Sequence, residues 1–238
     1  MEKRAELSPR LQGVAEMIPE GARLADVGTD HAYLPAWLLQ NGRIPSAIAS
    51  DVREGPLSRA RATARACGCF ERMSFRLCDG LSGIAPEEVD ALVIAGMGGE
   101  TIANILEAAP WVKEKDFPII LQPMSTQAEL RGWLWRNGFR ITREDLVGEG
   151  RTIYVVITVI PGAMVPLSPA EEWAGRQYRG MKSPLRAEYL DKLCERMAGM
   201  VEGLRRSTRL EDLEKLPHLE EVLAGLNEMK EEWNRWYR

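Results

Sequence analysis

Residues 24–35 read Leu-Ala-Asp-Val-Gly-Thr-Asp-His-Ala-Tyr-Leu-Pro, and this stretch decides the fold. The apolar residues at 24, 25 and 27 are typical of the end of a buried strand. A tight polar turn follows around Gly28, and residues 32–41 have the composition of a helix. A strand, a glycine turn and a helix together form the unit that holds a nucleoside-bearing cofactor at the carboxyl end of a parallel sheet.

The turn contains one glycine, Gly28, and two acids, Asp26 and Asp30. A dinucleotide fingerprint needs three glycines at Gly-x-Gly-x-x-Gly spacing, so that a pyrophosphate can approach the backbone. The two acids would repel a pyrophosphate, but they suit a cofactor that has a cationic centre and no phosphate. The turn therefore predicts S-adenosylmethionine as the cofactor.

The composition is that of a globular protein without a general attraction for nucleic acid. The 238 residues are 45% hydrophobic and 28% charged, which suits one large core or one core with an appendage. Because the net charge is −4, any RNA contact requires a local basic patch. No apolar run reaches the ~20 residues of a membrane span, and the first residues lack the apolar core of a signal peptide.

The four cysteines, Cys67, Cys69, Cys78 and Cys194, lack the paired spacing of a zinc site. Cys67 and Cys69 flank Gly68, where we expect a helix to end. We therefore expect reduced thiols, no metal ion, no membrane contact and a cytoplasmic protein.

Strand-like and helix-like segments alternate from residue 22 to about residue 145, which is typical of parallel βαβ units. Strands are expected near residues 22–27, 46–51, 73–77, 89–95, 117–121, 139–145 and 151–160. Helices are expected near residues 7–18, 32–41, 55–67, 98–109 and 125–137. Only Val147-Gly-Glu-Gly150 separates the last two strands, so they form an antiparallel hairpin. The predicted fold class is α/β, a Rossmann-like class I methyltransferase sheet with an antiparallel final hairpin.

Residues 161–168 have the composition of a linker, after which β-branched residues become scarce. Apolar residues then recur every three to four positions and predict helices at 184–206 and 211–236. Two such helices form an antiparallel coiled-coil hairpin. The predicted domains are a methyltransferase domain at residues 1–162 and a C-terminal helical, coiled-coil domain at residues 163–238.

Two further acids follow predicted strands. Asp51 ends the second strand, where a carboxylate can accept hydrogen bonds from both hydroxyls of a ribose, and a capping or loop role is the alternative. Asp79 and Gly80 follow the third strand, where an acid can meet an adenine amino group, although Asp-Gly is also an ordinary turn. Because Asp51 follows a turn that already carries Asp26 and Asp30, we favour the cofactor-binding role.

The fourth predicted strand ends in Ile94-Ala-Gly-Met-Gly-Gly-Glu100. Three glycines in four residues let a ligand press against the backbone, whereas a plain strand-to-helix turn needs about one. We therefore expect ligand contact at this turn. His31 lies beside the first turn, either as a ligand contact or as a structural residue, and Gln122 closes the fifth strand.

The same segment bears on the atom that is methylated. Methyltransferases that act on the exocyclic amine of adenine carry an acid or asparagine, then Pro-Pro and an aromatic residue, at this place. This chain has Ala95-Gly-Met-Gly-Gly99 instead. The sequence therefore favours methylation of a ring nitrogen. Its lone pair lies in the plane of the ring, so the enzyme does not need a residue that holds the amino group.

Several motifs together resemble the TrmK family, bacterial tRNA adenine-N1 methyltransferases that act on adenine 22. The motifs are Leu7-Ser-Pro-Arg-Leu11, Asp26-Val-Gly-Thr-Asp-His-Ala-Tyr-Leu-Pro35, Gly55-Pro56, Asp79-Gly-Leu81, Ala95-Gly-Met-Gly-Gly99, Leu121-Gln-Pro123 and Leu130-Arg-x-Trp-Leu134. The resemblance is dense over residues 7–157 and looser beyond them. Two positions depart from the family pattern: Asp51 stands where Glu is frequent, and Met124 stands where Asn is usual, so a polar contact in the target pocket is lost.

The resemblance implies cofactor-binding roles for the matching residues. Gly28 would admit the methionine part of S-adenosylmethionine, and Asp26 would orient the turn and hold the amino group through water. Asp51 would bind the ribose hydroxyls. Asp79 and Gly80 would bind the adenine end of the cofactor.

On the target side, Ala95, Gly96 and Met97 would form the floor where the methyl group is transferred. Asp30 would stabilise the positive charge of the methylated base or accept a proton, and Arg10 would hold a phosphate beside the target. The resemblance thus implies an enzyme that uses S-adenosylmethionine to form m1A22 in its partner, tRNA.

Two other functions stay open on the sequence alone. One is a non-catalytic RNA-binding protein on a methyltransferase fold, which the intact set of acids disfavours. The other is a small-molecule methyltransferase, which the long charged tail disfavours. The sequence leaves the tRNA isoacceptor undetermined, and we expect a monomer.

Helical spacing also predicts a basic surface in the tail. Arg176, Arg179, Lys182 and Arg186 recur every three to four residues, so one helix face there should be basic. We expect that face to contact the phosphate backbone of tRNA.

Overall fold

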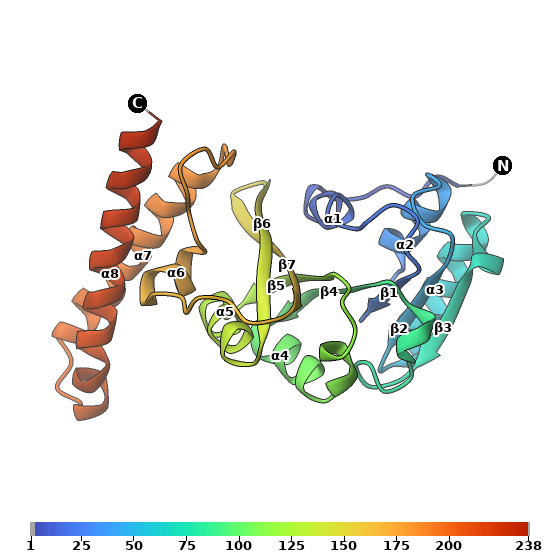
Figure 1. Cartoon of the computed structure of the whole chain (residues 1–238), viewed down its shortest axis with the longest axis horizontal. Helices are drawn as coiled ribbons and strands as arrows, with labels where there is room; N and C mark the ends of the chain where they lie inside the picture. Colours follow the sequence, from blue (N-terminus) through green and yellow to red (C-terminus); the bar gives the residue numbers. More distant parts are fainter. Residues whose placement is uncertain (1–2, 238) are drawn as a thin grey trace.

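The computed structural model describes residues 3–237 and contains one seven-stranded mixed sheet (Figure 1). Its strand order is β3-β2-β1-β4-β5-β7-β6. The strands are β1 Leu24–Val27, β2 Ala47–Asp51, β3 Met73–Leu77, β4 Ala91–Gly98, β5 Ile119–Ser125, β6 Phe139–Glu149 and β7 Thr152–Pro161. β1 to β5 pair in parallel, and β7 runs antiparallel to both β5 and β6. This order confirms the predicted α/β class with an antiparallel final hairpin.

The connections between the strands are helical. The α-helices are α1 Pro9–Ala15, α2 Tyr33–Gln40, α3 Glu54–Ala66, α4 Gly99–Glu107, α5 Gln127–Arg136, α6 Pro169–Ala174, α7 Arg186–Arg205 and α8 Leu210–Trp236. Short 3-10 turns lie at η1 Phe70–Arg72, η2 Pro86–Glu88 and η3 Pro110–Lys113. In the part of the chain that the structure describes, no helix is both long and apolar enough to cross a membrane.

The apolar residues of β4 alternate between two cores, one on each face of the sheet. Leu92 and Ile94 face α4, α5 and the C-terminal helices, whereas Ala91 and Val93 face α1, α2 and α3. Successive side chains of a strand point to opposite faces, so a strand that is covered on both faces is apolar throughout. This double burial explains the unbroken apolar run that precedes Ala95 in the sequence.

The final hairpin is longer than the sequence predicts. β6 continues to Glu149 instead of ending near residue 145, and Glu149 pairs with Thr152 across a two-residue turn. Gly150 in that turn has a φ of 61°, a value that glycine adopts without strain. Pairing with the apolar β7 therefore extends the strand through residues 146–149.

The C-terminal helices form the predicted antiparallel hairpin, which lies at one end of the sheet (Figure 1). Lys230 pairs with Asp191, and Arg205 pairs with Glu220, so charges bridge the two helices near both ends. α8 continues through Pro217.

The helix α6 is absent from the sequence-based prediction. Its start is a capping box, in which Ser168 and Glu171 bond each other's backbone N–H groups. One continuous apolar core joins the sheet to α6, α7 and α8. The domain boundary at residues 162 and 163 stays a prediction, and residues 1, 2 and 238 of the predicted domains lie outside the described residues.

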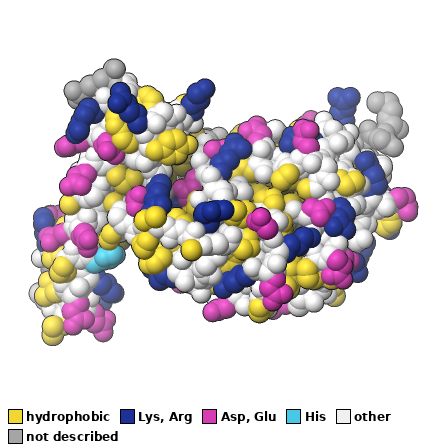
Figure 2. Space-filling model, viewed as in Figure 1, with side chains coloured by type: hydrophobic (Ala, Val, Ile, Leu, Met, Phe, Trp, Pro, Cys, Tyr) yellow, Lys and Arg dark blue, Asp and Glu magenta, His cyan; other side chains and the backbone are white. Residues whose placement is uncertain are grey.

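The predicted basic helix face in the tail is wrong. Its residues are Arg176, Arg179, Lys182 and Arg186. No residue from Gly175 to Leu185 is helical, because Gly175 and Gly180 adopt φ values of 72° and 94° that a helix cannot accommodate. Arg186 is buried. On the face that Figure 2 shows, Lys and Arg are scattered among Asp and Glu.

Two buried arginines donate hydrogen bonds to the backbone carbonyls at the end of α6. Arg131 of α5 donates from Nε to Glu144 Oε1 on β6 (2.7 Å) and from Nη1 to two carbonyls of α6 (2.8 and 3.0 Å). Arg186, at the start of α7, donates to the carbonyls of Ala174 and Gly175. Burial lowers the pKa of Arg186 to about 10, although the nearby Glu144 carboxylate opposes this effect. Cations at the carboxyl end of a helix satisfy its free carbonyls.

We predict that Arg131→Met destabilises the fold by about 3–5 kcal/mol, because it leaves the largely buried Glu144 carboxylate without its ion-pair partner. Arg136→Met on the same helix removes a half-exposed arginine from its pair with Glu172 and should cost less than about 1 kcal/mol. Urea unfolding of both variants measures the difference. Equal losses of unfolding free energy in the two variants would show that the Arg131–Glu144 pair stabilises the fold no more than the exposed pair does.

Candidate functional site

A cavity of about 710 Å³ opens at the carboxyl ends of β1, β2 and β4. β1 lies between β2 and β4, where the strand order reverses, and open α/β sheets bind ligands in the crevice at that point. Eight predicted site residues line the cavity: Gly28, Asp30, Asp51, Asp79, Gly80, Ala95, Gly96 and Met97. The other three, Arg10, Asp26 and His31, lie outside its lining.

The first turn of the cavity is held by close backbone contacts. The N–H groups of Gly28 and Thr29 both donate to the carbonyl of Ser50 on β2 (2.8 and 3.0 Å). Gly28 has a φ of 72°, and a Cβ at this position would overlap the ε-methyl group of Met97. The backbone angle therefore favours glycine here, whereas the overlap with the end of the flexible Met97 side chain could be relieved by rotation of that side chain.

Asp26 lies beneath the turn rather than in the cavity wall. Its side chain is buried and accepts a hydrogen bond from the Thr29 hydroxyl (2.5 Å). Burial raises the pKa of Asp26 to about 6, with a smaller contribution from the Asp51 charge, while the Thr29 hydrogen bond opposes the rise. A carboxyl group in this state titrates close to neutral pH.

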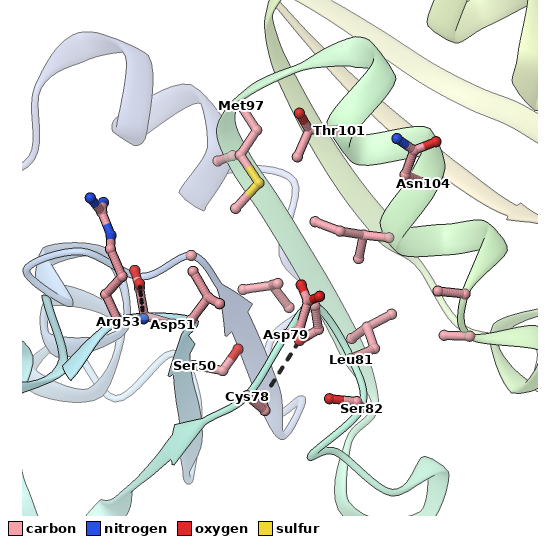
Figure 3. Close-up of a pocket in the computed structure, with 18 of the residues that line it drawn as sticks. Ser50, Asp51, Arg53, Cys78, Asp79, Leu81, Ser82, Met97, Thr101 and Asn104 are labelled. Atoms are coloured by element: carbon pink, nitrogen blue, oxygen red, sulfur yellow. Dashed lines mark hydrogen bonds between the residues drawn. The ribbon is translucent and has the colours of Figure 1, made fainter.

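Asp51 ends β2 and faces the cavity, as Figure 3 shows. Its Oδ1 accepts the Arg53 N–H (2.9 Å), which fixes the carboxylate at the start of α3. The neighbouring Ser50 also lines the cavity, and its hydroxyl is buried and has no hydrogen-bond partner among the described residues. A buried hydroxyl without a partner is costly, so Ser50 points to a polar ligand group at this wall.

The opposite wall comes from α4, which the sequence-based prediction of the site does not include. Thr101 and Asn104 of α4, and Ala108 just after its end, line the cavity, and Figure 3 shows Thr101 and Asn104 across from Asp51. Their spacing of three and four residues places them on one side of a helix, and this is the signal by which sequence alone can find them. The Asp79 loop lies between the two walls.

The three glycines at the end of β4 serve different purposes. Gly96 has a φ of 78° and lines the cavity, as expected for ligand contact. Gly99 packs so closely on Thr126 that a Cβ would overlap its carbonyl oxygen. The glycine at 99 is therefore required by the packing of α4 against the chain that leads into α5, and the prediction that all three glycines serve a ligand is too broad.

Asp30 and His31 lie next to each other, and both side chains are partly exposed. Asp30 has a φ of 49°, and its carboxylate accepts from Arg59 Nη2 (2.6 Å) and lies 3.7 Å from His31 Nε2. The His31 ring stacks on Tyr33 with centroids 5.3 Å apart. Within residues 3–237, no three His, Cys, Asp or Glu side chains gather into a group suited to a metal ion.

Known proteins share this arrangement. A model of the methyltransferase domain family matches residues 7–157. The crystal structure of the Bacillus subtilis m1A22 tRNA methyltransferase TrmK has a TM-score of 0.84 and 30% identity, covering 95% of this chain and 100% of that one. The chain belongs to the TrmK family.

Two further relatives extend the TrmK comparison. A tRNA (adenine(22)-N(1))-methyltransferase of Bacillus subtilis (strain 168) is 40% identical over 156 residues, and this aligned segment spans 66% of each protein. A Streptococcus pneumoniae structure, described as a proposed tRNA (m1A22) methyltransferase in complex with S-adenosyl-L-methionine, has a TM-score of 0.77 and 35% identity. It covers 92% of this chain and 100% of that one.

We predict that Asp26→Asn removes a pH-dependent instability. The folded pKa of about 6 lies above the ordinary value of 3.8, so between these values the folded protein binds a proton that the unfolded chain has released. The stability contributed by Asp26 therefore falls as the pH rises from about 4 to about 6. At about pH 8 the Asn variant should be more stable than the native chain by up to about 3 kcal/mol.

Urea unfolding at about pH 4.5, 6 and 8 measures this difference, which should shrink towards the lowest pH. Asp116→Asn changes an exposed acid outside the cavity and serves as the control. A stability difference that is constant over this range would contradict the shifted pKa.

Proposed function

We propose that this chain transfers a methyl group from S-adenosylmethionine to N1 of adenine 22 in tRNA. The TrmK relatives support the reaction, and the Streptococcus pneumoniae relative supports the cofactor. The observation that carries the proposal is the cavity at the strand reversal, lined by Asp30, Asp51 and Asp79. Three acids suit a cofactor with a sulfonium centre and disfavour a dinucleotide.

The lining residues fit the parts of this cofactor. Asp51 would accept the ribose hydroxyls, with the unpartnered Ser50 hydroxyl as a further contact. The loop at Asp79 and the apolar side chain of Leu81 would hold the adenine. Gly28 exposes backbone to the methionine part, and Asp26 beneath it supplies negative potential for the amino group. The bound cofactor supplies an electrophilic methyl group.

The protein's main task in the reaction is alignment. Adenine N1 carries a lone pair and needs no base to remove a proton before it attacks. Holding the base in line can contribute up to ~7–11 kcal/mol, against a cost of a few kcal/mol for taking it out of its stack. Ala95 and Met97 form an apolar floor next to Gly28, which keeps water from the transferring group.

The two alternative functions lack a specific observation in their favour. The acids of the cavity are intact, which a non-catalytic RNA-binding protein would not need. We propose that the protein acts as a cytoplasmic monomer. Light scattering of the purified protein, alone and with tRNA, tests the monomer.

The function is tested by mass spectrometry of nucleosides from tRNA incubated with the protein and S-adenosylmethionine. We expect N1-methyladenosine at position 22, and no such product with Asp51→Ala. Calorimetry should show that Asp51→Ala weakens cofactor binding at least about tenfold, because charge-assisted hydrogen bonds to the ribose are lost. Asp116→Ala should match the native chain in both assays.

Methylation of a free small molecule, with no methylation of tRNA, would show that the protein is a small-molecule methyltransferase. Binding of tRNA without any methyl transfer would favour a non-catalytic RNA-binding protein. Unchanged cofactor affinity in Asp51→Ala would remove this residue from the site.

We predict that Asp30→Asn slows methylation while it leaves cofactor affinity within about twofold. Methylation at N1 creates a cationic base, and the exposed Asp30 carboxylate, which lines the cavity, would stabilise that charge. A loss in kcat of about tenfold or more is expected, since the variant keeps the shape and removes the charge. Single-turnover kinetics with saturating cofactor measure it. Normal turnover would assign Asp30 to the Arg59 ion pair alone.

A further inference from the structure

Gln122, at the end of β5, is a completely buried polar side chain next to the cavity. Its Oε1 accepts two hydrogen bonds, one from Arg10 Nη1 (2.6 Å) and one from the Gly96 backbone N–H (3.2 Å). Its Nε2 donates to the carbonyl of Pro123 (3.1 Å). Because donors meet the oxygen and an acceptor meets the nitrogen, the carboxamide has one satisfied orientation.

The first partner of Gln122 belongs to the cavity floor. Gly96 lines the cavity, has a φ of 78°, and sits where the β4–β5 register shifts between Ala95 and Met97. No regular ladder bond can hold a peptide at such an irregularity. The side chain of Gln122 takes over that task and fixes the peptide between the two floor residues.

The second partner is a cation held at the edge of the floor. The Arg10 guanidinium lies 3.7 Å from the place where a Gly96 Cβ would be, and 5.8 Å above the Tyr154 ring. The backbone N–H of Arg10 donates to Glu149 Oε2 (3.0 Å), which anchors α1 to β6. Within residues 3–237, the Arg10 guanidinium forms no ion pair.

The neutral amide explains how Arg10 can be both fixed and charged. A glutamate at 122 would orient the guanidinium equally well, but it would neutralise the charge and lose the hydrogen bond to Pro123. A glutamine orients the guanidinium and leaves its positive charge available. An arginine that is preorientated and unpaired beside a nucleotide-sized cavity suits a phosphate, because its planar fork matches the phosphate oxygens.

We propose that Gln122 is a positioning residue with two partners: it fixes the Gly96 peptide in the floor and presents the charged Arg10 guanidinium to a phosphate that flanks the adenine entering the cavity. The inference rests on the proposed function, since it assumes an RNA substrate. It assigns Gln122 no contact with the reacting atoms.

Two substitutions separate the two partners. Gln122→Glu keeps an acceptor for Gly96 but pairs with Arg10, so it should raise the KM for tRNA about tenfold and leave kcat within about threefold. Gln122→Leu removes the acceptor for both partners, so kcat should fall as well. Gln12→Glu adds the same charge on α1 and serves as the control for general repulsion of RNA.

Salt dependence identifies the phosphate contact. The logarithm of the tRNA association constant falls linearly with the logarithm of the salt concentration, and loss of one phosphate contact makes this slope shallower by ~0.7–0.9. We expect this change for Gln122→Glu and for Arg10→Gln. The double variant should show no further loss, because both changes remove the same contact. Arg10 is half-buried and belongs to neither apolar core, so Arg10→Gln should fold normally. It therefore tests the phosphate contact even if the substitutions at the buried Gln122 disturb the fold.

Native salt slopes in both single variants would overturn the proposal. So would parallel losses of cofactor affinity and melting temperature in Gln122→Glu, because they indicate a purely structural role.

These binding measurements do not require turnover. If the native chain methylates adenine 22 while the variants bind normally, the roles of Gln122 and Arg10 are wrong and the proposed function stands. If the native chain neither binds nor methylates tRNA, the proposed function fails and this inference fails with it.

Discussion

The site depends on the close approach of the β1 turn to the neighbouring strands. Gly28 turns with a positive φ directly beneath Met97, and the N–H groups of Gly28 and Thr29 are tied to the Ser50 carbonyl. These contacts bring the ends of β1, β2 and β4 to one place. Acids that are far apart in the chain, such as Asp30 and Asp79, thereby line one cavity. A side chain at residue 28 would strain the turn, because φ is 72° there, and would displace the end of the Met97 side chain.

The C-terminal helices are part of the same folded body rather than a tethered appendage. Their apolar residues continue the core on one face of the sheet, and the largely buried Arg131–Glu144 pair lies where α5, α6 and β6 meet. A rearrangement that separated this pair would leave an unpaired charge in a low dielectric, which is strongly unfavourable. The hairpin of α7 and α8 is joined to the sheet by the shared apolar core and by the bonds of Arg186 to the carbonyls of Ala174 and Gly175.

Charge is divided across the site. Acids occupy the side formed by β1, β2 and the loop after β3, where a sulfonium cofactor would lie. The cation Arg10 stands on the other side, where α1 meets β4 and β5, and a neutral amide holds it. Keeping the two signs apart lets one small cavity serve a cationic cofactor and an anionic RNA without mutual neutralisation.

The sequence by itself determined the fold class and most of the site. The apolar runs and the turn at Gly28 predict the parallel sheet, and the position of Asp51 after its strand predicts its place in the cavity, because parallel strands end at a common edge. Helix periodicity also predicts the C-terminal hairpin. These are local signals, and each depends only on neighbouring residues.

Only the tertiary structure decided which residues meet across the chain. In the structure Asp26 lies beneath the turn, and Thr101 and Asn104 line the cavity. Arg186 is buried and donates to carbonyls at the end of α6 instead of belonging to a basic helix face. It also joined Gln122 to Arg10, 112 positions away. Such contacts have no periodicity in the sequence, because they depend on the packing of separate elements rather than on the spacing of residues within one.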